Sequence, residues 1–72
     1  MHEMSVMTHE GDTKCYWDPN NPESVKVASE TFAAHAQRGY RAFSMVGTQG
    51  TIMDVFDPNA AQILFVPAMQ GG

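Results

Sequence analysis

The stretch QILFVPAMQGG, residues 62–72, is the most informative part of this chain, because an apolar run passes through a proline and reaches two glycines. Four consecutive apolar residues, 63–66, are typical of a strand that is buried on both faces. We therefore expect residues 62–67 to form a central strand of a sheet. Pro67 would end its hydrogen-bond ladder, and residues 68–72 would project from the sheet as a tail.

A helix is expected upstream, over residues 22–38. Asn21 is a favourable N-cap, and Pro22 fits the first helical position, where no amide donor is needed. Gly39 supplies a left-handed stop. The apolar side of this helix has spacings of three and four and consists of Val25, Ala28, Phe32 and Ala36, while Lys26, Glu30 and Gln37 are expected to face water.

Strands are expected on both sides of this helix. Residues 41–46 and 51–56 predict an antiparallel hairpin with its turn at 47–50, and residues 60–61 are expected to form one helical turn. Residues 13–17 predict a strand before the helix. Residues 3–8 alternate only weakly, so two interpretations stay open: a further strand, or a loose tail over residues 1–11.

These elements predict one α+β domain over residues 1–72, with the helix packed across a mixed sheet of four or five strands. Phe32 is expected to fill the covered face of the sheet together with Val55 and Leu64. The hydrophobic fraction of 43% is ordinary for a folded domain. A chain of this length is marginally stable, so packing or a partner must stabilise it.

Composition argues against several classes of function. The net charge is −4 and the four Lys and Arg residues are dispersed, which disfavours nucleic-acid binding and suits a basic protein partner better. The sequence shows no secretory leader and no segment of transmembrane length, so no membrane association and a cytoplasmic location are expected. Cys15 is the only cysteine, which excludes an intrachain disulfide and gives no zinc spacing.

No group of residues predicts catalysis, a cofactor or a metal. Cys15 has no neighbouring histidine or helix start to activate it, and a structural role is expected. His35 is expected at the edge of the buried side of the helix. Asp18 and Asp57 each precede a proline, where aspartate commonly caps a turn. Asp12 and Asp54 could take part in acid–base chemistry, and His2 and His9 could bind a metal, but their spacing favours neither.

The element order, together with Ile63–Gly72, resembles the ubiquitin-like β-grasp family. The closest likeness is to its sulfur-carrier branch, which includes the small subunit of molybdopterin synthase and the thiamine sulfur carrier. In that branch the last strand is hydrophobic, often passes through proline and ends in two glycines. The branch stays open between sulfur carrier and protein modifier.

This resemblance implies a β-grasp fold and a carried substrate, not an enzyme. A partner activating enzyme would adenylate the Gly72 carboxylate with ATP. Sulfide would then capture the acyl group as a thiocarboxylate, or a cysteine would capture it as a thioester for transfer to an acceptor protein. Gly71 and Gly72 suit a narrow channel because they have no Cβ. Pro67, Met69 and Gln70 would contact the enzyme.

A second interpretation is a small interaction protein without catalytic activity, such as a viral or mobile-element accessory protein, an inhibitor or an assembly subunit. It would bind through an aromatic or sheet-edge surface. Tyr16, Trp17, Tyr40 and Phe43 are the aromatic residues that could form this surface, and of these Trp17 and Tyr40 are the candidate contact residues. For Trp17, a core position and an interface position are equally compatible with the sequence.

Overall fold

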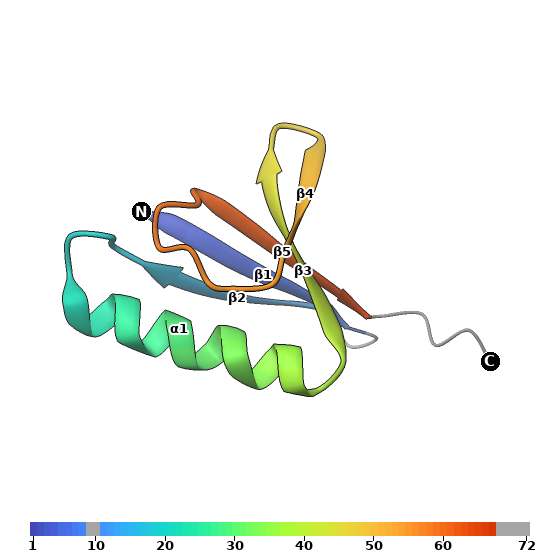
Figure 1. The fold of residues 1–72 in the computed structure, drawn as a ribbon, viewed down its shortest axis with the longest axis horizontal. Coiled ribbons are helices and arrows are strands. Elements are labelled where there is room, and N and C mark those ends of the chain that lie inside the picture. The colour runs from blue at the N-terminus through green and yellow to red at the C-terminus, as the bar shows by residue number, and fades with distance from the viewer. Residues whose placement is uncertain (9–10, 68–72) are drawn as a thin grey trace.

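The structure is a computed structural model that describes residues 1–8 and 11–67 of the 72-residue chain. The described residues form a sheet and a helix that lies across it (Figure 1). In chain order the elements are β1 (His2–Thr8), β2 (Gly11–Trp17), α1 (Pro22–Gln37), β3 (Tyr40–Val46), β4 (Gln49–Met53) and β5 (Gln62–Pro67).

The described strands form a five-stranded mixed sheet in the order β2-β1-β5-β3-β4. β1 and β5 are parallel, and every other neighbouring pair is antiparallel. The predicted α+β, β-grasp-like arrangement is therefore confirmed, as is the central position of residues 62–67. Residues 2–8 form β1 between β2 and β5, so the interpretation of residues 1–11 as a loose tail is wrong for them.

The helix begins as the sequence predicts. The Asn21 side chain accepts hydrogen bonds from the backbone N–H groups of Glu23 and Ser24, at 3.1 and 3.3 Å. These bonds satisfy two of the donors that the first turn leaves without a partner. At the other end Gly39 has a φ of 94°, which glycine tolerates and which stops the helix one residue earlier than expected, with Arg38 as its cap.

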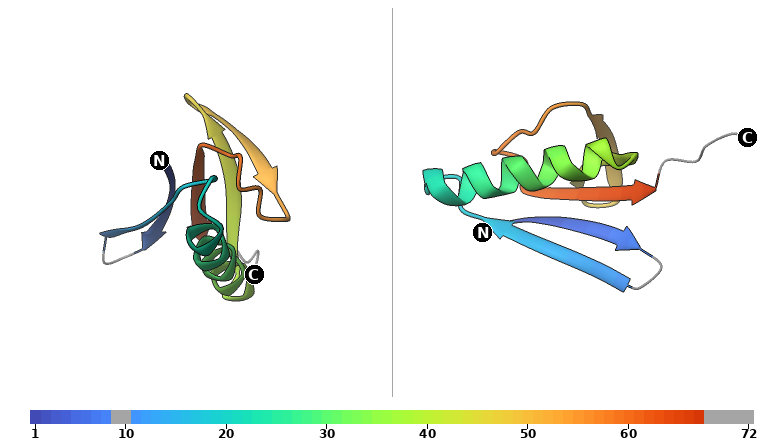
Figure 2. Two further views of the ribbon diagram at one scale, coloured as in Figure 1. Left: turned by 90° about the vertical axis from the view of Figure 1, so that its left-hand side faces the viewer. Right: turned by 90° about the horizontal axis from the view of Figure 1, so that it is seen from below.

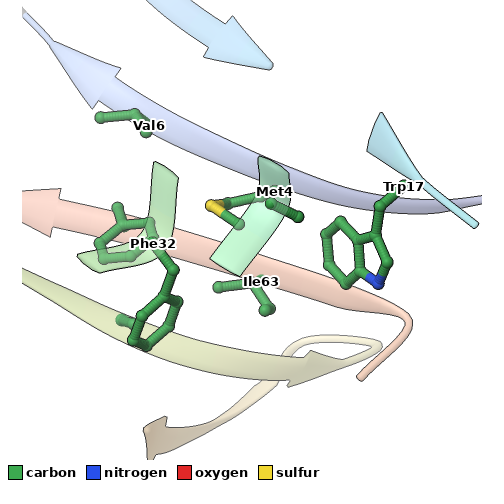
Figure 3. Close-up of a cluster of buried hydrophobic side chains, with 8 residues drawn as sticks. Met4, Val6, Trp17, Phe32 and Ile63 are labelled. Carbon is green, nitrogen blue, oxygen red and sulfur yellow. The ribbon is translucent and has the colours of Figure 1, made fainter. Parts of the chain in front are cut away.

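The hydrophobic core lies between α1 and the face of the sheet that it covers (Figures 2 and 3). Parallel pairing places Met4 beside Ile63 and Val6 beside Phe65, so alternate residues of the two central strands point into the core. Phe32 of α1 meets Phe65 edge-on at a centroid distance of 5.1 Å. The buried hydrophobic residues are Met4, Val6, Trp17, Ala28, Phe32, Ala42, Ile63 and Phe65.

Trp17 closes one end of this core and is fully buried. Its indole Nε1–H donates a hydrogen bond to the Pro58 carbonyl oxygen at 3.0 Å. The indole also packs edge-on against Phe56, with a centroid distance of 5.2 Å. Of the two interpretations for Trp17, the structure supports the core position. Its expected role in partner binding is corrected, because a side chain without solvent exposure offers no contact surface.

The expected second arm of the hairpin is also corrected. β4 ends at Met53, and residues 54–56 leave the sheet. As a result Val55 is 78% exposed, whereas Phe56 turns inward and packs against Phe32 at 5.7 Å. Leu64 points away from Phe32, because it alternates with the core residues on either side of it. Phe56 and Phe65 therefore occupy the place in the core that was expected for Val55 and Leu64.

Smaller differences concern the turns and one helical residue. Val46 pairs with Gln49, so the hairpin turn contains only Gly47 and Thr48, with a φ of 63° at Gly47. Residues 57–60 form a turn, in which the Ala60 N–H donates to the Asp57 carbonyl oxygen at 3.1 Å, and no helical turn follows. Ala36 is exposed, since residues 54–56 do not cover that part of α1.

Replacing Trp17 by phenylalanine tests the core position. We expect Trp17→Phe to lower the free energy of unfolding by about 1–3 kcal/mol, because it removes a buried hydrogen bond and leaves a void. The adjacent Tyr16 is 52% exposed, and Tyr16→Phe is the matched control with an expected change below about 0.5 kcal/mol. Urea denaturation followed by far-ultraviolet circular dichroism measures both. Equal effects of the two changes would contradict the position of Trp17.

Candidate functional site

The end of β5 is the first candidate site. Pro67 is its last residue and lies opposite Tyr40, at the start of β3. Proline has no N–H to extend the ladder, which agrees with the predicted end of this strand. Because β5 lies between β1 and β3, Pro67 is the end of a central strand and not of an edge strand. The predicted tail contacts at Met69, Gln70, Gly71 and Gly72 lie outside the described residues.

His35 and Tyr40 lie beside this end of β5. The His35 ring packs against Phe65 at a centroid distance of 5.3 Å and meets Tyr40 edge-on at 6.0 Å. Its Nδ1 atom is shielded from solvent and has no hydrogen-bond partner among the residues that the structure describes. Burial lowers the pKa of His35 below 6.5, and the nearby Arg38 lowers it further. His35 therefore favours the neutral form, and its contacts are those of a packing residue at the edge of the core, as expected.

Of the two candidate contact residues Trp17 and Tyr40, Tyr40 keeps partial exposure. Its side chain is half-buried. It contacts the His35 ring on one side and lines a hollow next to β4 on the other. It therefore remains available to a partner at the rim of the core. Trp17, the other aromatic candidate, does not.

The second candidate site is the face of the sheet that α1 leaves uncovered, which we call the open face (Figure 2). It is formed by the residues that alternate with the core positions along the strands. One row crosses all five described strands, from Lys14 through Ser5, Leu64 and Phe43 to Ile52. The apolar members of the open face are Met7, Phe43, Met45, Ile52, Leu64 and Val66.

The open face is apolar over β5, β3 and β4, and its charged residues include Glu3 of β1, Lys14 of β2 and Arg41 at the start of β3. Met7 and Ile52 are 48% and 50% exposed, and Phe43 and Leu64 are half-buried. Large apolar surfaces left in contact with water commonly mark a site where another protein binds. The sequence interpretation included Phe43 in an aromatic contact surface but did not predict this apolar face as a whole, although Phe43 and Met45 alternate with Ala42 and Ser44 and thus signal a second apolar side of β3.

Two cations of the open face lie beside its apolar part, one on β2 and one on β3. Lys14 of β2 is 4.0 Å from the Glu3 carboxylate, which also accepts a hydrogen bond from Gln62 at 3.3 Å. Arg41 of β3 is exposed beside Val66. Two of the four Lys and Arg residues of the chain therefore lie on strand positions of this face. Such a face suits an apolar partner surface with acidic groups at its margin.

A groove beside α1 is the third candidate site. It has a volume of about 400 Å³. Among the described residues that line it, Asp54 is the only ionisable one, and they include no acid–base pair and no nucleophile with a base. It is lined by Ser29, Phe32, Ala33, Ala36, Gln37, Asp54, Val55 and Phe56.

The remaining candidates have structural contacts. Asp18 and Asp57 each accept a hydrogen bond at 2.9 Å from the backbone N–H two residues later, which confirms the predicted turns. Cys15 is half-buried against the core with a free thiol. His2 packs edge-on against Trp17 at 5.6 Å. Within residues 1–8 and 11–67, no cluster of three potential metal ligands occurs.

Comparison with known proteins gave no match to a family model, a curated protein sequence or a solved structure. The described part of the chain contains no helix with the length and apolar character needed to cross a membrane.

The lowered pKa of His35 predicts a dependence of stability on pH. In the unfolded chain the imidazole has a pKa of 6.5 and binds a proton more tightly than in the folded protein. The contribution of neutral His35 to the free energy of unfolding is therefore complete above pH 6.5. It is lost as the pH falls through the lower pKa of the folded protein. We expect His35→Gln to flatten the pH profile of the free energy of unfolding below pH 6.5. Urea denaturation at a series of pH values measures it, and parallel profiles for the two proteins would contradict this prediction.

Proposed function

We propose that this protein is a ubiquitin-like carrier or modifier that is activated at Gly72 by a partner enzyme. The observation that carries the proposal is the central position of β5, which ends at Pro67 and is followed directly in the sequence by Ala68-Met69-Gln70-Gly71-Gly72. β5 pairs with β1 through Phe65 and with β3 through Pro67, so the strand that precedes this segment belongs to the centre of the sheet. The residues that follow have no branched or aromatic side chain, so they suit a narrow active-site channel.

The chemistry of this function belongs to the partner. The Gly72 carboxylate attacks the α-phosphorus of ATP, pyrophosphate leaves, and an acyl adenylate forms. Sulfide or a cysteine thiolate then attacks the acyl carbon, and AMP leaves with the electron pair of the broken bond. The products are a thiocarboxylate or a thioester. This requires a free Gly72 carboxylate, either as the end of the mature protein or after processing.

The described residues contribute binding and presentation. The open face offers an apolar surface on which a folded enzyme can dock, and Lys14 and Arg41 would meet acidic groups at its margin. Tyr40 lies opposite Pro67, where an enzyme that grips the tail would also reach.

Intact-mass analysis of the protein from its native host tests the activation. We expect either a mass gain equal to the exchange of one oxygen for sulfur, or a set of covalent conjugates. Both signals disappear when residues 71–72 are deleted, because the activated carboxylate is then lost. The matched control is Thr48→Ala, an exposed change in the hairpin turn that should leave the signals intact. A chain without either modification, in the presence of the activating enzyme, would overturn the proposal.

A second candidate function is a binding module that uses the open face without covalent chemistry. The observation that favours it is the apolar row through Leu64 and Phe43, which does not depend on the glycines. The two functions differ in the effect of the tail. Deletion of residues 71–72 abolishes a carrier function but leaves a binding module unaffected.

Phe43 at the centre of the open face gives a direct test of docking. We expect Phe43→Ala to weaken the binding of a protein partner by about tenfold or more, as for a central interface aromatic. Val27→Ala is the control, because Val27 is apolar and 58% exposed on α1. Calorimetric titration of the partner with each variant measures the affinities. Equal affinities for the two variants would show that the partner binds elsewhere.

A further inference from the structure

Strand β4 forms one edge of the sheet and has an outer side that pairs with no described residue. Gly47 and Thr48 form a two-residue turn, so Val46 and Gln49 exchange the first hydrogen bonds of the hairpin. In an antiparallel ladder, hydrogen-bonded residue pairs alternate with pairs that are not hydrogen-bonded, so Thr51 and Met53 are the next residues of β4 that bond to β3. The backbone N–H and C=O groups of Gly50 and Ile52 therefore point away from the sheet.

This edge lacks the features that normally prevent pairing with another chain. Natural edge strands commonly carry charged residues, proline or a bulge. The sequence of β4, Gln-Gly-Thr-Ile-Met, contains no charge and no proline. The opposite edge, β2, has Asp12 and Lys14 in its sequence. The two edges of the sheet therefore differ, and β4 is the one suited to accept a strand.

We propose that two copies of this chain associate by antiparallel pairing of their β4 strands, with Thr51 on the two-fold axis. In this register Gly50 of each copy lies opposite Ile52 of the other. Both residues have outward-pointing backbone groups, so each Gly50–Ile52 pair can exchange hydrogen bonds. The pairing joins the two sheets into one continuous sheet across the dimer.

The side chains near the axis fit this register. Gly50 offers a bare backbone, over which Ile52 of the second copy can lie beside Met45. A Cβ built on Gly50 would be only 3.0 Å from the Met45 sulfur, so Met45 already packs closely over this glycine. The apolar groups of Phe43, Met45 and Ile52 from the two copies would merge into one strip. On the other face the two Thr51 hydroxyls would be adjacent, which is a favourable cross-strand pair.

Charge also permits a second copy at this edge, although each chain has a net charge of −4. No charged residue lies within Gln49–Met53. The nearest acid, Asp54, would face Thr48 of the other copy and not a second carboxylate. Self-pairing of β2 would instead bring charged positions into the contact.

Sedimentation velocity over a wide range of protein concentration tests the dimer. We expect a reversible monomer–dimer equilibrium, and we expect Ile52→Lys to raise its dissociation constant by at least about tenfold, because the variant places charge in the apolar strip. Tyr16→Lys is the matched control on the opposite edge, since Tyr16 and Ile52 are 52% and 50% exposed. Circular dichroism melting checks that both variants fold.

Amide hydrogen exchange gives an independent measure of where the copies meet. The amides of Gly50 and Ile52 should exchange slowly in the dimer and become fast on dilution, while the Thr51 amide stays protected by β3. A protein that remains monomeric at every concentration overturns the proposal. So does a dimer that is unaffected by Ile52→Lys, or one that is lost in Tyr16→Lys. A monomer whose β4 amides are protected only when another protein is added would assign the edge to that partner instead.

Discussion

Parallel pairing of β1 with β5 is the interaction on which the rest of this structure depends. It places Met4 beside Ile63 and Val6 beside Phe65, and these four side chains form the centre of the core. β2 and β3 complete the ladders on the two outer sides of this pair. The helix then covers the side chains that the pair presents on one face. Without β1, the last strand would lose its ladder on one side and its contacts with Met4 and Val6.

The same arrangement explains why one face of the sheet stays open. The connection from β2 to β3 supplies α1, and the connection from β4 to β5 turns inward through Phe56 on the side of the helix. No described segment is left for the opposite face. Each Å² of apolar surface left in water forgoes about 25 cal/mol of stabilisation. An apolar open face in a chain this small is therefore best understood as a surface for a partner, which is the feature that both functional interpretations share.

The sequence predicted the elements with strong local signals. Asn21, Pro22 and Gly39 defined the helix, and the apolar run at residues 63–66 identified the central strand. Weak local signals gave the errors. Met4 and Val6 are separated by a small polar Ser5 that tertiary packing buries to 9% exposure, so β1 could not be distinguished from a tail. Local pattern could not show that Phe56 replaces Val55 in the core, because that exchange depends on where β4 leaves the sheet.

The candidate site was predictable only in part. The end of β5 at Pro67 followed from the chemistry of proline. The open face could not be predicted in this way, because an alternating pattern shows that a strand has two faces but does not show which face a helix will cover. Trp17 illustrates the same limit: its burial depends on Pro58 and Phe56, which are distant in sequence.

The parallel pairing of the first strand with the last has a consequence for biosynthesis. The contacts between Val6 and Phe65 join residues at nearly opposite ends of the chain, so the central pair has a high contact order. The whole of β5, up to residue 67, must leave the ribosome before β1 can pair with it. Until then β1, β2 and α1 emerge with an incomplete core. The domain is therefore expected to fold after its last strand has been synthesised, and to expose its apolar strands to chaperones in the meantime.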